Sequence, residues 1–366
     1  MLARLVSKTS LLLIPTRFIS SSTRMGKNNK KKPQAPNEQN LILPVHSSAV
    51  GLSETSGSPP VIPIVDTHTH VLSTFSAYRT KYPDGQYNTI SEFFRALYHD
   101  PAVSNGGVHP VEAIVDVWCE APELREWRTL ADSALTEEMR EKEWSGIQYH
   151  FVMGVHPHNA KDYTDEVENE ILEAMAHPRC VGWGEMGLDY HYTLSPKETQ
   201  QEVLVRQLRH AVRLGKPLTI HTREADADIE RILKAEVPKD HKIHVHCFTD
   251  SPELATSLLD HFPNLYIGIT GVITYATNFN TSAVIRHLSA DPSKPLRILL
   301  ETDAPYMTPS NLYPSLSSEV KGRLPFCHTA MIPWTAEFVA GVAGDAWDTE
   351  RVMRESRKNA RDMYGV

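Results

Sequence analysis

The sequence has 366 residues, with 37 Lys and Arg against 45 Asp and Glu, which gives a formal net charge of −8. This length accommodates one large barrel domain, and the hydrophobic fraction of 41% is enough for an ordinary core. The negative balance excludes a protein that coats nucleic acid with a generally basic surface, so local features such as metal ions or a basic cleft would have to bind such a polymer.

The N-terminal 60 residues differ in composition from the rest of the chain. Residues 1–37 contain no Asp or Glu but several Arg, Ser and Thr, which is typical of a mitochondrial transit peptide, although Pro15 would interrupt its helix and a plain disordered tail is the alternative. Translation from Met25 would instead give a cytoplasmic or nuclear form with a basic tail. Residues 33–60 are rich in Pro, Ser and Gly, so we expect residues 1–60 to be disordered and residues 61–366 to form the folded domain.

Beyond this segment, short apolar runs alternate with amphipathic segments. Such runs are expected where both faces of a parallel strand are buried. We predict strands at Ile62–Val65, Ala113–Val117, Tyr149–Met153, Cys180–Trp183, Leu218–Ile220, Ile243–Val245, Leu265–Ile267 and Ile298–Leu300. Helices are predicted at Lys197–Leu214, Glu224–Ala235, Pro252–Leu259, Thr329–Val342 and Asp348–Tyr364.

Eight alternating units favour an α/β fold of the (β/α)8 TIM-barrel type, with right-handed crossovers between parallel strands. The stretch Leu72–Ile147 is long for one unit, and an insertion at Ser73–Asn88 could form a lid or rim. The four cysteines (Cys119, Cys180, Cys247 and Cys327) are scattered without a CxxC pair, which argues against disulfides and against a cysteine zinc site. No apolar run is long enough to span a membrane.

Imidazoles and carboxylates follow the predicted strands at the ends where barrel chemistry takes place. Six candidate metal ligands lie there, namely His68, His70, Glu185, His221, His246 and Asp303. Because six ligands exceed the three or four that one ion needs, the pattern predicts two divalent ions, such as Mg²⁺, Mn²⁺ or Zn²⁺, with a carboxylate bridging them. A single histidine after a strand is more often structural, and we interpret His150, His177, His210, His241, His244 and His261 in that way.

At its motifs the sequence resembles the TatD family of metal-dependent deoxyribonucleases, which belong to the amidohydrolase-like superfamily. The matching strings are Asp66–His70, Gly154–His158, Gly184–Tyr190, His221–Ala225, His246–Thr249, Tyr266–Gly271 and Glu301–Tyr306, and they follow one another in the family's order. The resemblance implies hydrolysis of DNA phosphodiester bonds, often by a 3′-to-5′ exonuclease that acts on single strands.

Residue roles follow from this resemblance. It implies that His68, His70, Glu185 and Asp303 hold one ion, and that Glu185, His221 and His246 hold the second, with Glu185 as the bridge. Glu185 and Asp303 are then catalytic, and Asp303 takes a proton from the attacking water. His156 and Arg223 would contact the scissile phosphate.

The sequence departs from the family where an Asn-Glu-Pro string is usual. Here Lys321–His328 keeps Arg323 and Pro325, and His328 has no family counterpart. This departure and the long Leu72–Ile147 stretch put the choice of substrate in doubt.

Two alternatives to a DNA nuclease therefore stay open. The same barrel could hydrolyse an amide or ester such as an aminoacyl-tRNA, or it could be a non-enzymatic interaction protein. The intact ligand set argues against the second, because a scaffold does not need to keep buried polar groups at one rim. DNA is the expected partner, and nothing implies an obligate protein partner.

Overall fold

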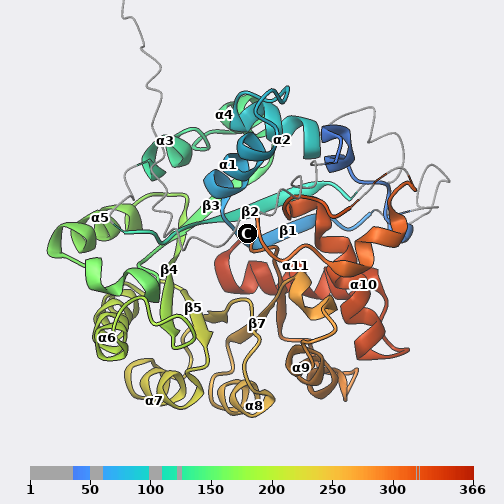
Figure 1. Cartoon of the computed structure of the whole chain (residues 1–366). Coiled ribbons are helices and arrows are strands. Elements are labelled where there is room, and N and C mark those ends of the chain that lie inside the picture. The colour runs from blue at the N-terminus through green and yellow to red at the C-terminus, as the bar shows by residue number, and fades with distance from the viewer. Residues whose placement is uncertain (1–35, 50–60, 99–108, 122–125, 319, 321) are drawn as a thin grey trace, which may run out of the picture. The chain divides into compact units, whose positions relative to one another are not determined.

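The computed structural model describes residues 36–49, 61–98, 109–121, 126–318, 320 and 322–366, so the expected targeting segment 1–35 lies outside the described residues. Eight parallel strands pair in chain order, from β1 to β8, as a barrel sheet requires (Figure 1). They are β1 (Ile64–Thr69), β2 (Val111–Trp118), β3 (Gln148–Met153), β4 (Cys180–Asp189), β5 (Leu218–Arg223), β6 (Ile243–Val245), β7 (Leu265–Ile269) and β8 (Ile298–Leu300). The predicted fold class and all eight strands are confirmed, but β1, β4 and β5 run on into the polar motifs that follow their apolar runs.

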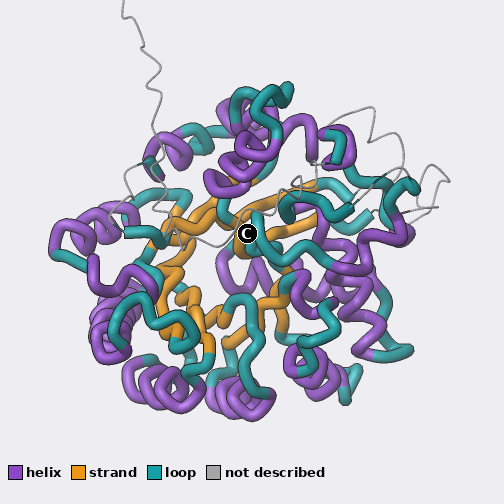
Figure 2. Tube along the Cα trace, viewed as in Figure 1, coloured by secondary structure: helices purple, strands orange, loops and turns teal. Residues whose placement is uncertain are grey.

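Helices surround the strands on the outside, as the tube view shows (Figure 2). They are α1 (Val71–Lys81), α2 (Ile90–Tyr98), α3 (Trp127–Asp132), α4 (Glu137–Trp144), α5 (Asp165–Met175), α6 (Lys197–Leu214), α7 (Asp226–Glu236), α8 (Pro252–His261), α9 (Asn280–Ser289), α10 (Ile332–Ala343) and α11 (Thr349–Tyr364). The prediction for α6 matches the structure at both ends. At its C-terminal end, Gly215 adopts the left-handed conformation (φ 64°) that terminates the helix. No helix within the described ranges is both long and apolar enough to cross a membrane.

The described residues of the long stretch Leu72–Ile147 form helices before and after strand β2. Most of the proposed insertion Ser73–Asn88 is helix α1, whose Tyr78 ring is fully buried in the main hydrophobic core. Helix α2 follows, and its Phe93 is also fully buried. A segment with such buried anchors is part of the barrel wall.

The barrel closes between its first and last strands through hydrogen bonds just beyond the end of β8. The amide of Asp303 donates to the carbonyl of His68 at 2.9 Å, and the amide of His70 donates to the carbonyl of Ala304 at 3.0 Å. The buried carboxylate of Asp66 adds a second tie, because it accepts the hydroxyl of Thr302 at 2.6 Å. Three of these residues, His68, His70 and Asp303, are candidate metal ligands, so the closure and the candidate site share the same backbone.

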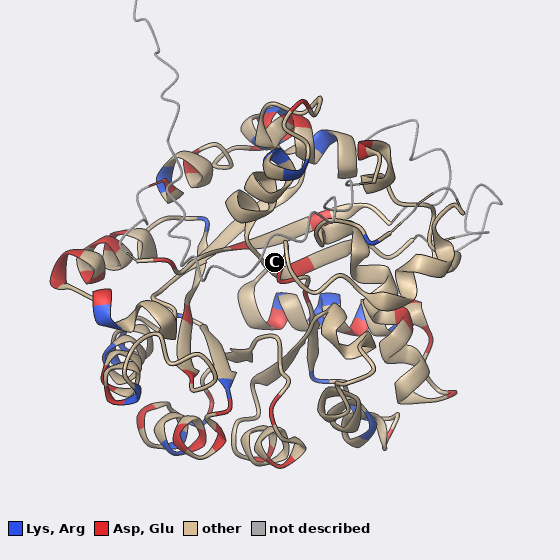
Figure 3. Ribbon diagram, in the orientation of Figure 1, with Lys and Arg blue, Asp and Glu red and all other residues tan. Residues whose placement is uncertain are grey.

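Small apolar side chains and the C-terminal helix fill a second core cluster. Val65, Val115 and Val152 come from β1, β2 and β3, and they pack in one cluster with Met363 and Tyr364 of α11. Charged residues are drawn mainly on the outer helices, with both signs mixed on α6 and α7 (Figure 3). This mixed distribution agrees with the absence of a generally basic character in the sequence.

An N-terminal arm, residues 36–49, packs on the barrel with two 3-10 turns at Glu38–Leu41 and Ser47–Ala49. Leu41 is fully buried, and the Glu38 carboxylate accepts hydrogen bonds from the Tyr78 hydroxyl and from the amide of Gln86 at 3.1 Å. These described residues therefore pack on the barrel although they precede the boundary predicted at Val61. The Pro-rich composition of residues 33–60 gives no sign of these buried anchors, and the domain boundary stays a prediction.

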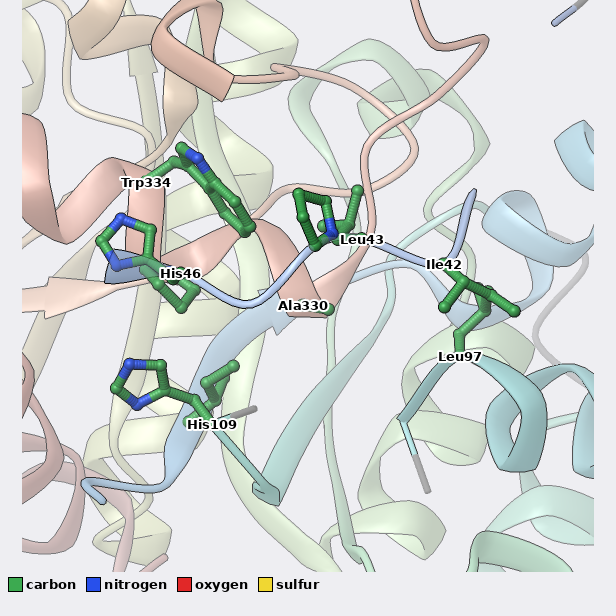
Figure 4. A pocket seen from close by; sticks show the side chains of 10 residues that line it. Ile42, Leu43, His46, Leu97, His109, Ala330 and Trp334 are labelled. Atoms are coloured by element: carbon green, nitrogen blue, oxygen red, sulfur yellow. The ribbon is translucent and has the colours of Figure 1, made fainter. Parts of the chain in front are cut away.

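A small pocket lies under this arm (Figure 4). The ring of His46 packs edge-on against Trp334, with centroids 4.9 Å apart, and Ser48 links the arm to the Nε2 atom of His109 at 2.9 Å. The lining is mostly apolar and includes no carboxylate. The pocket is therefore a packing feature of the arm rather than a metal site.

Candidate metal centre

All six predicted ligands lie at the carboxyl ends of barrel strands, which we call the mouth. His68 belongs to β1, Glu185 to β4 and His221 to β5, while His70, His246 and Asp303 directly follow or lie just beyond β1, β6 and β8. In a parallel barrel these ends face the same side. The structure brings the six side chains together, although their role as ligands stays a prediction.

Two irregularities in strand pairing lie at the ligands. The register shifts between Trp183 and Met186 on β4, and Glu185 lies inside this shift. A second shift lies between Asp66 and Thr69 on β1, around His68. Extra residues of this kind re-aim side chains near functional sites. Gly184 makes the β4 irregularity possible, because a Cβ atom there would lie 2.4 Å from the carbonyl oxygen of Thr219.

The carboxylate of Glu185 lies at the centre of the cluster and faces two groups of imidazoles. Its Oε1 atom is 2.7 Å from Nε2 of His246, 2.8 Å from Nδ1 of His221 and 3.4 Å from Nε2 of His156. Its Oε2 atom is 3.4 Å from Nε2 of His68. A carboxylate with one oxygen toward each group has the geometry of a bridge between two cations.

Asp303 completes the second group. Its Oδ1 atom is 3.3 Å from Nε2 of His70 and 3.7 Å from Nε2 of His68. The imidazoles of His68 and His70 therefore both approach the same carboxylate oxygen. Asp303 also has a left-handed backbone (φ 50°), an uncommon conformation for a non-glycine residue that recurs at functional sites.

The donor set fits divalent cations. Within the described part of the chain, three groups of side chains offer ligand atoms within 4.8 Å of one another: His68, His246 and Asp303; His68, His70 and Glu185; and His156, Glu185 and His221. The Nε2 atom of His68 is buried without a hydrogen-bond partner and lies between two carboxylates. A buried imidazole nitrogen in this position suits a metal ion, and mixed imidazole and carboxylate donors suit Zn²⁺, Mn²⁺ and related ions.

The electrostatics keep the carboxylates ionised. Burial alone would raise the pKa of Glu185, but His246 and His156 hold this pKa well below its ordinary value. Burial also opposes ionisation of Asp303, and the hydrogen bond from His70 nevertheless keeps its pKa lowered. Burial lowers the pKa of His68 to about 4, so this imidazole is neutral at physiological pH. Ionised carboxylates and neutral imidazoles are the forms that bind metal.

Two histidines of the cluster are instead more basic than usual. Burial would lower the pKa of His70, but its hydrogen bond to Asp303 raises it to about 9. Likewise burial opposes the charge on His221, but Asp189 and Glu185 raise its pKa to about 9. These imidazoles carry protons that a bound cation would have to displace, so metal binding should release protons.

Asp189 also contacts the histidine cluster, and no role is predicted for it from the sequence. Its Oδ2 atom lies 2.9 Å from Nε2 of His158 and 3.4 Å from Nε2 of His221. A carboxylate behind a ligand histidine fixes the ring's orientation and raises its basicity. The signal was present, because Asp189 belongs to the Gly184–Tyr190 string.

A buried polar chain, which we call the floor, lies beneath the ligands. Its members are Thr219, Tyr364, His244 and Glu301, and all four are at most 7% exposed. The Tyr364 hydroxyl is 2.6 Å from Oγ1 of Thr219 and 2.9 Å from Nδ1 of His244, whose Nε2 atom lies 2.9 Å from Oε2 of Glu301. Glu301 then accepts a hydrogen bond from the amide of Cys247 at 2.5 Å, next to the candidate ligand His246. The structural interpretation of His244 agrees with this position, and no local sequence signal could have linked Tyr364 to it.

The two predicted phosphate contacts differ in their surroundings. His156 lies in one of the candidate metal groups, so its position suits a ligand as well as a substrate contact. Arg223 ends β5 and is half-buried, and its guanidinium lies over the Tyr192 ring at 4.9 Å from the centroid. Among the described residues no carboxylate pairs with this guanidinium, which leaves it available for an anion at the mouth.

His328, the residue that departs from the family pattern, lies away from the metal groups. It is fully buried, and its ring lies 5.9 Å from that of Tyr98. Leu324, Phe326 and Cys327 beside it are also buried, whereas Arg323 is exposed. His328 thus packs in the interior and belongs to none of the candidate metal groups.

An eight-stranded parallel barrel with a cluster of histidines and carboxylates at its mouth defines a class of proteins, the (β/α)8 barrels built to hold divalent metal ions. The sequence matches the family model described as TatD related DNase over residues 65–365. The chain therefore belongs to this family, and the predicted resemblance is confirmed.

Three relatives illustrate the similarity. The chain is 43% identical over 255 residues to the human 3'-5' RNA nuclease TATDN2, which covers 69% of this chain but 30% of that protein. It is 37% identical over 165 residues to the uncharacterized metal-dependent hydrolase YabD of Bacillus subtilis, covering 44% of this chain and 62% of that protein. It is 34% identical over 193 residues to the 3'-5' ssDNA/RNA exonuclease TatD of Escherichia coli K12, covering 52% of this chain and 72% of that protein. The chain thus matches less than two thirds of the length of the first two relatives.

Solved structures agree on the fold. An uncharacterized amidohydrolase from Saccharomyces cerevisiae superposes with a TM-score of 0.65 at 18% identity, covering 83% of this chain and 100% of that one. The TatD homologue YJJV from Escherichia coli superposes with a TM-score of 0.60 at 21% identity, covering 84% of this chain and 100% of that one. At this level of identity the likeness supports the barrel architecture alone.

Proposed function

We propose that this protein is a metal-dependent nuclease that hydrolyses phosphodiester bonds in single-stranded nucleic acid, acting on DNA as a 3′-to-5′ exonuclease. One observation carries the proposal: the buried Glu185 carboxylate presents one oxygen to each of two imidazole groups. That arrangement suits two cations held close together, and paired cations are the usual device for in-line displacement at phosphorus.

The residue roles are those that the family resemblance implies, and the clustering of these side chains supports them. His68, His70, Glu185 and Asp303 would hold one ion, and Glu185, His221 and His246 the other, with Mg²⁺, Mn²⁺ or Zn²⁺ as the candidate ions. When bound, the ions supply positive charge to the phosphate and lower the pKa of water. This local charge also explains how a chain with a net charge of −8 could act on a polyanion.

Side chains of the protein orient the substrate and move the proton. Asp303 is ionised because nearby histidines lower its pKa, so its carboxylate can accept a proton from the attacking water. The free guanidinium of Arg223 would bind a phosphate oxygen and stabilise charge that builds up there. His156 would act beside it, either on the phosphate or on the ion near Glu185.

The names of the relatives support a nucleic-acid substrate. The human relative is named an RNA nuclease and the Escherichia coli relative an ssDNA/RNA exonuclease. Both names support 3′-to-5′ polarity, and the choice between DNA and RNA is part of the test.

The experiment uses the full chain after chelation, reloaded with Mg²⁺, Mn²⁺ or Zn²⁺. Labelled single-stranded DNA, duplex DNA, single-stranded RNA and an aminoacyl ester are compared as substrates. We expect stepwise loss from the 3′ end of single strands with at least one ion, and loss of this activity in Glu185→Gln. The matched control Glu253→Gln changes an exposed glutamate on α8 and should retain activity. Turnover of the ester but not of nucleic acid, or full activity in Glu185→Gln, would overturn the proposal.

We also propose that the acid-free segment 1–37 directs the protein to mitochondria. A fusion of this segment to a fluorescent protein should be imported, whereas a chain begun at Met25 should stay in the cytoplasm or nucleus. Cytoplasmic fluorescence from the fusion that carries residues 1–37 would contradict this proposal.

A further inference from the structure

Three aromatic rings are exposed on loops at the mouth. Tyr192 is 55% exposed, Phe279 is 75% exposed and Tyr306 is 57% exposed. They lie after β4, after β7 and after β8, respectively, where each strand ends toward the candidate metal centre. The other large exposed apolar side chains of the described part are aliphatic or Met, so these three are the aromatic members of that set.

The three rings stand on backbone that is held in place. The amide of Tyr192 donates to Oδ1 of Asp189 at 3.0 Å, and Asp189 in turn contacts the ligand His221. The amide of Tyr306 donates to the carbonyl of Asp303 at 3.0 Å. The backbone amides that carry these two rings are thus hydrogen-bonded directly to residues of the candidate metal centre.

Phe279 precedes helix α9, whose start is tied to the loop that follows His246. The side-chain amide of Asn280 donates to the carbonyl of Thr249 at 3.1 Å, and the Thr281 hydroxyl donates to the carbonyl of Phe248 at 2.7 Å. Phe248 itself is 1% exposed, so the anchor is part of the core. The Phe279 ring is therefore presented to solvent by a fixed element.

Exposed rings around a polar site suit a ligand with flat apolar faces. A base stacked on an aromatic side chain contributes about 1–3 kcal/mol by alanine substitution, which corresponds to a change of about 5- to 150-fold in affinity, and this contact tolerates any sequence. In a duplex the base faces are already covered by their neighbours, so only unpaired bases can use such rings. Stacking also needs no basic surface, which this acidic chain lacks.

We propose that Phe279, Tyr306 and Tyr192 form a stacking rim that binds the unpaired bases of the nucleic acid whose phosphate enters the metal centre. This inference rests on the proposed nuclease function and adds the reason for single-strand preference. The cation of Arg223 over the Tyr192 ring extends the rim toward the phosphate position, because guanidinium groups stack on bases as well as on rings.

The test compares Phe279→Ala and Tyr306→Leu with the wild-type protein on three substrates of equal length: a single strand with bases, an abasic single strand and a duplex. We expect the preference in kcat/KM for the base-bearing strand over the abasic strand to fall about 5- to 100-fold in each variant, mainly through KM. Phe279→Trp should restore it, because a larger ring stacks at least as well. Leu135→Ala removes an exposed aliphatic side chain, 41% exposed, and serves as the control that keeps the preference.

Different results would refute the nuclease function and the stacking rim. If the wild-type protein cleaves no nucleic acid, or if Glu185→Gln cleaves it as well as the wild type does, the nuclease function is refuted. If the wild type cleaves single strands but Phe279→Ala and Tyr306→Leu keep the same preference for bases, the rim is refuted while the nuclease function stands. An equal loss on base-bearing and abasic strands would also refute the rim, because it would place the effect on phosphate binding.

Discussion

The hydroxyl of Tyr364 joins the C-terminal helix to the floor beneath the metal centre, so its removal tests whether the floor stabilises the barrel. Tyr364→Phe would delete the contacts with Oγ1 of Thr219 at 2.6 Å and with Nδ1 of His244 at 2.9 Å. The ring would stay in place among Met363 and Val152, so no cavity is made. The change thus isolates the two hydrogen bonds.

The contribution of these two hydrogen bonds to the free energy of unfolding depends on the burial of their partners. Each buried hydrogen bond contributes about 1 kcal/mol net, and a buried partner left unsatisfied costs about 1–3 kcal/mol. Thr219 and His244 are both fully buried, so solvent cannot replace the lost partner. We therefore expect the free energy of unfolding to fall by about 2–4 kcal/mol. We also expect metal affinity to fall about tenfold, because His244 contacts Glu301, which holds the backbone beside His246.

Urea unfolding followed by circular dichroism measures the first effect, and calorimetric titration of the chelated protein with Mn²⁺ or Zn²⁺ measures the second. Tyr266→Phe is the matched control, because Tyr266 belongs to the same core cluster and its hydroxyl makes no hydrogen bond within the described part of the chain. A Tyr364→Phe protein as stable as this control, with unchanged metal affinity, would refute the reasoning.

Three further changes test other parts of the fold. Leu41→Ala should lower the free energy of unfolding by about 2–5 kcal/mol in a urea titration, since its side chain is fully buried, whereas Val45→Ala, 39% exposed, should change it little. Burial lowers the pKa of His328 from 6.5 to about 4. Between pH 4 and pH 6.5 the imidazole is therefore protonated in the unfolded chain but neutral in the folded chain. The stability of the wild type relative to His328→Gln should thus stay level above pH 6.5 and fall by about 3 kcal/mol as the pH drops to 4; a flat difference would exclude this linkage. Gly268→Ala should destabilise the protein by about 1–3 kcal/mol and weaken metal binding in the same titrations, because its Cβ would lie 2.4 Å from Oε1 of Glu301 and 2.6 Å from Nε2 of His244.

The sequence was most informative where local patterns have one physical cause. Runs such as Ile243–Val245 and Ile298–Leu300 are apolar on both faces because parallel strands in a barrel are buried on both sides, and both runs were predicted with their observed bounds. Ligand candidates could be chosen for a similar reason. Polar residues after such strands reach the same mouth whatever their separation along the chain.

Other features depend on contacts that no local pattern records. Strand β4 was predicted to end at Trp183, because the Gly-Glu-Met-Gly string that follows resembles a loop, yet the strand continues through it to Asp189. The polar side chains there point into a mouth that exists only once the barrel closes. The arm could not be predicted because Leu41 is an isolated buried residue in a Pro-rich segment. The contact of Tyr364 with His244 could not be predicted because the two residues lie 120 positions apart in the sequence.

The position of the ligands at the seam between β1 and β8 gives the metal centre a second role. The backbone bonds that close the barrel there join His68 to Asp303 and His70 to Ala304, so three of the four residues carry candidate ligands. Burial opposes ionisation of Asp303 and protonation of His68 and His70, so the cluster carries a desolvation cost when the charges are left to the side chains alone. A cation bound between these candidate ligands would offset that cost. Metal binding would then also stabilise closure of the barrel, because the same short stretches of chain form the closing hydrogen bonds and carry the candidate ligands.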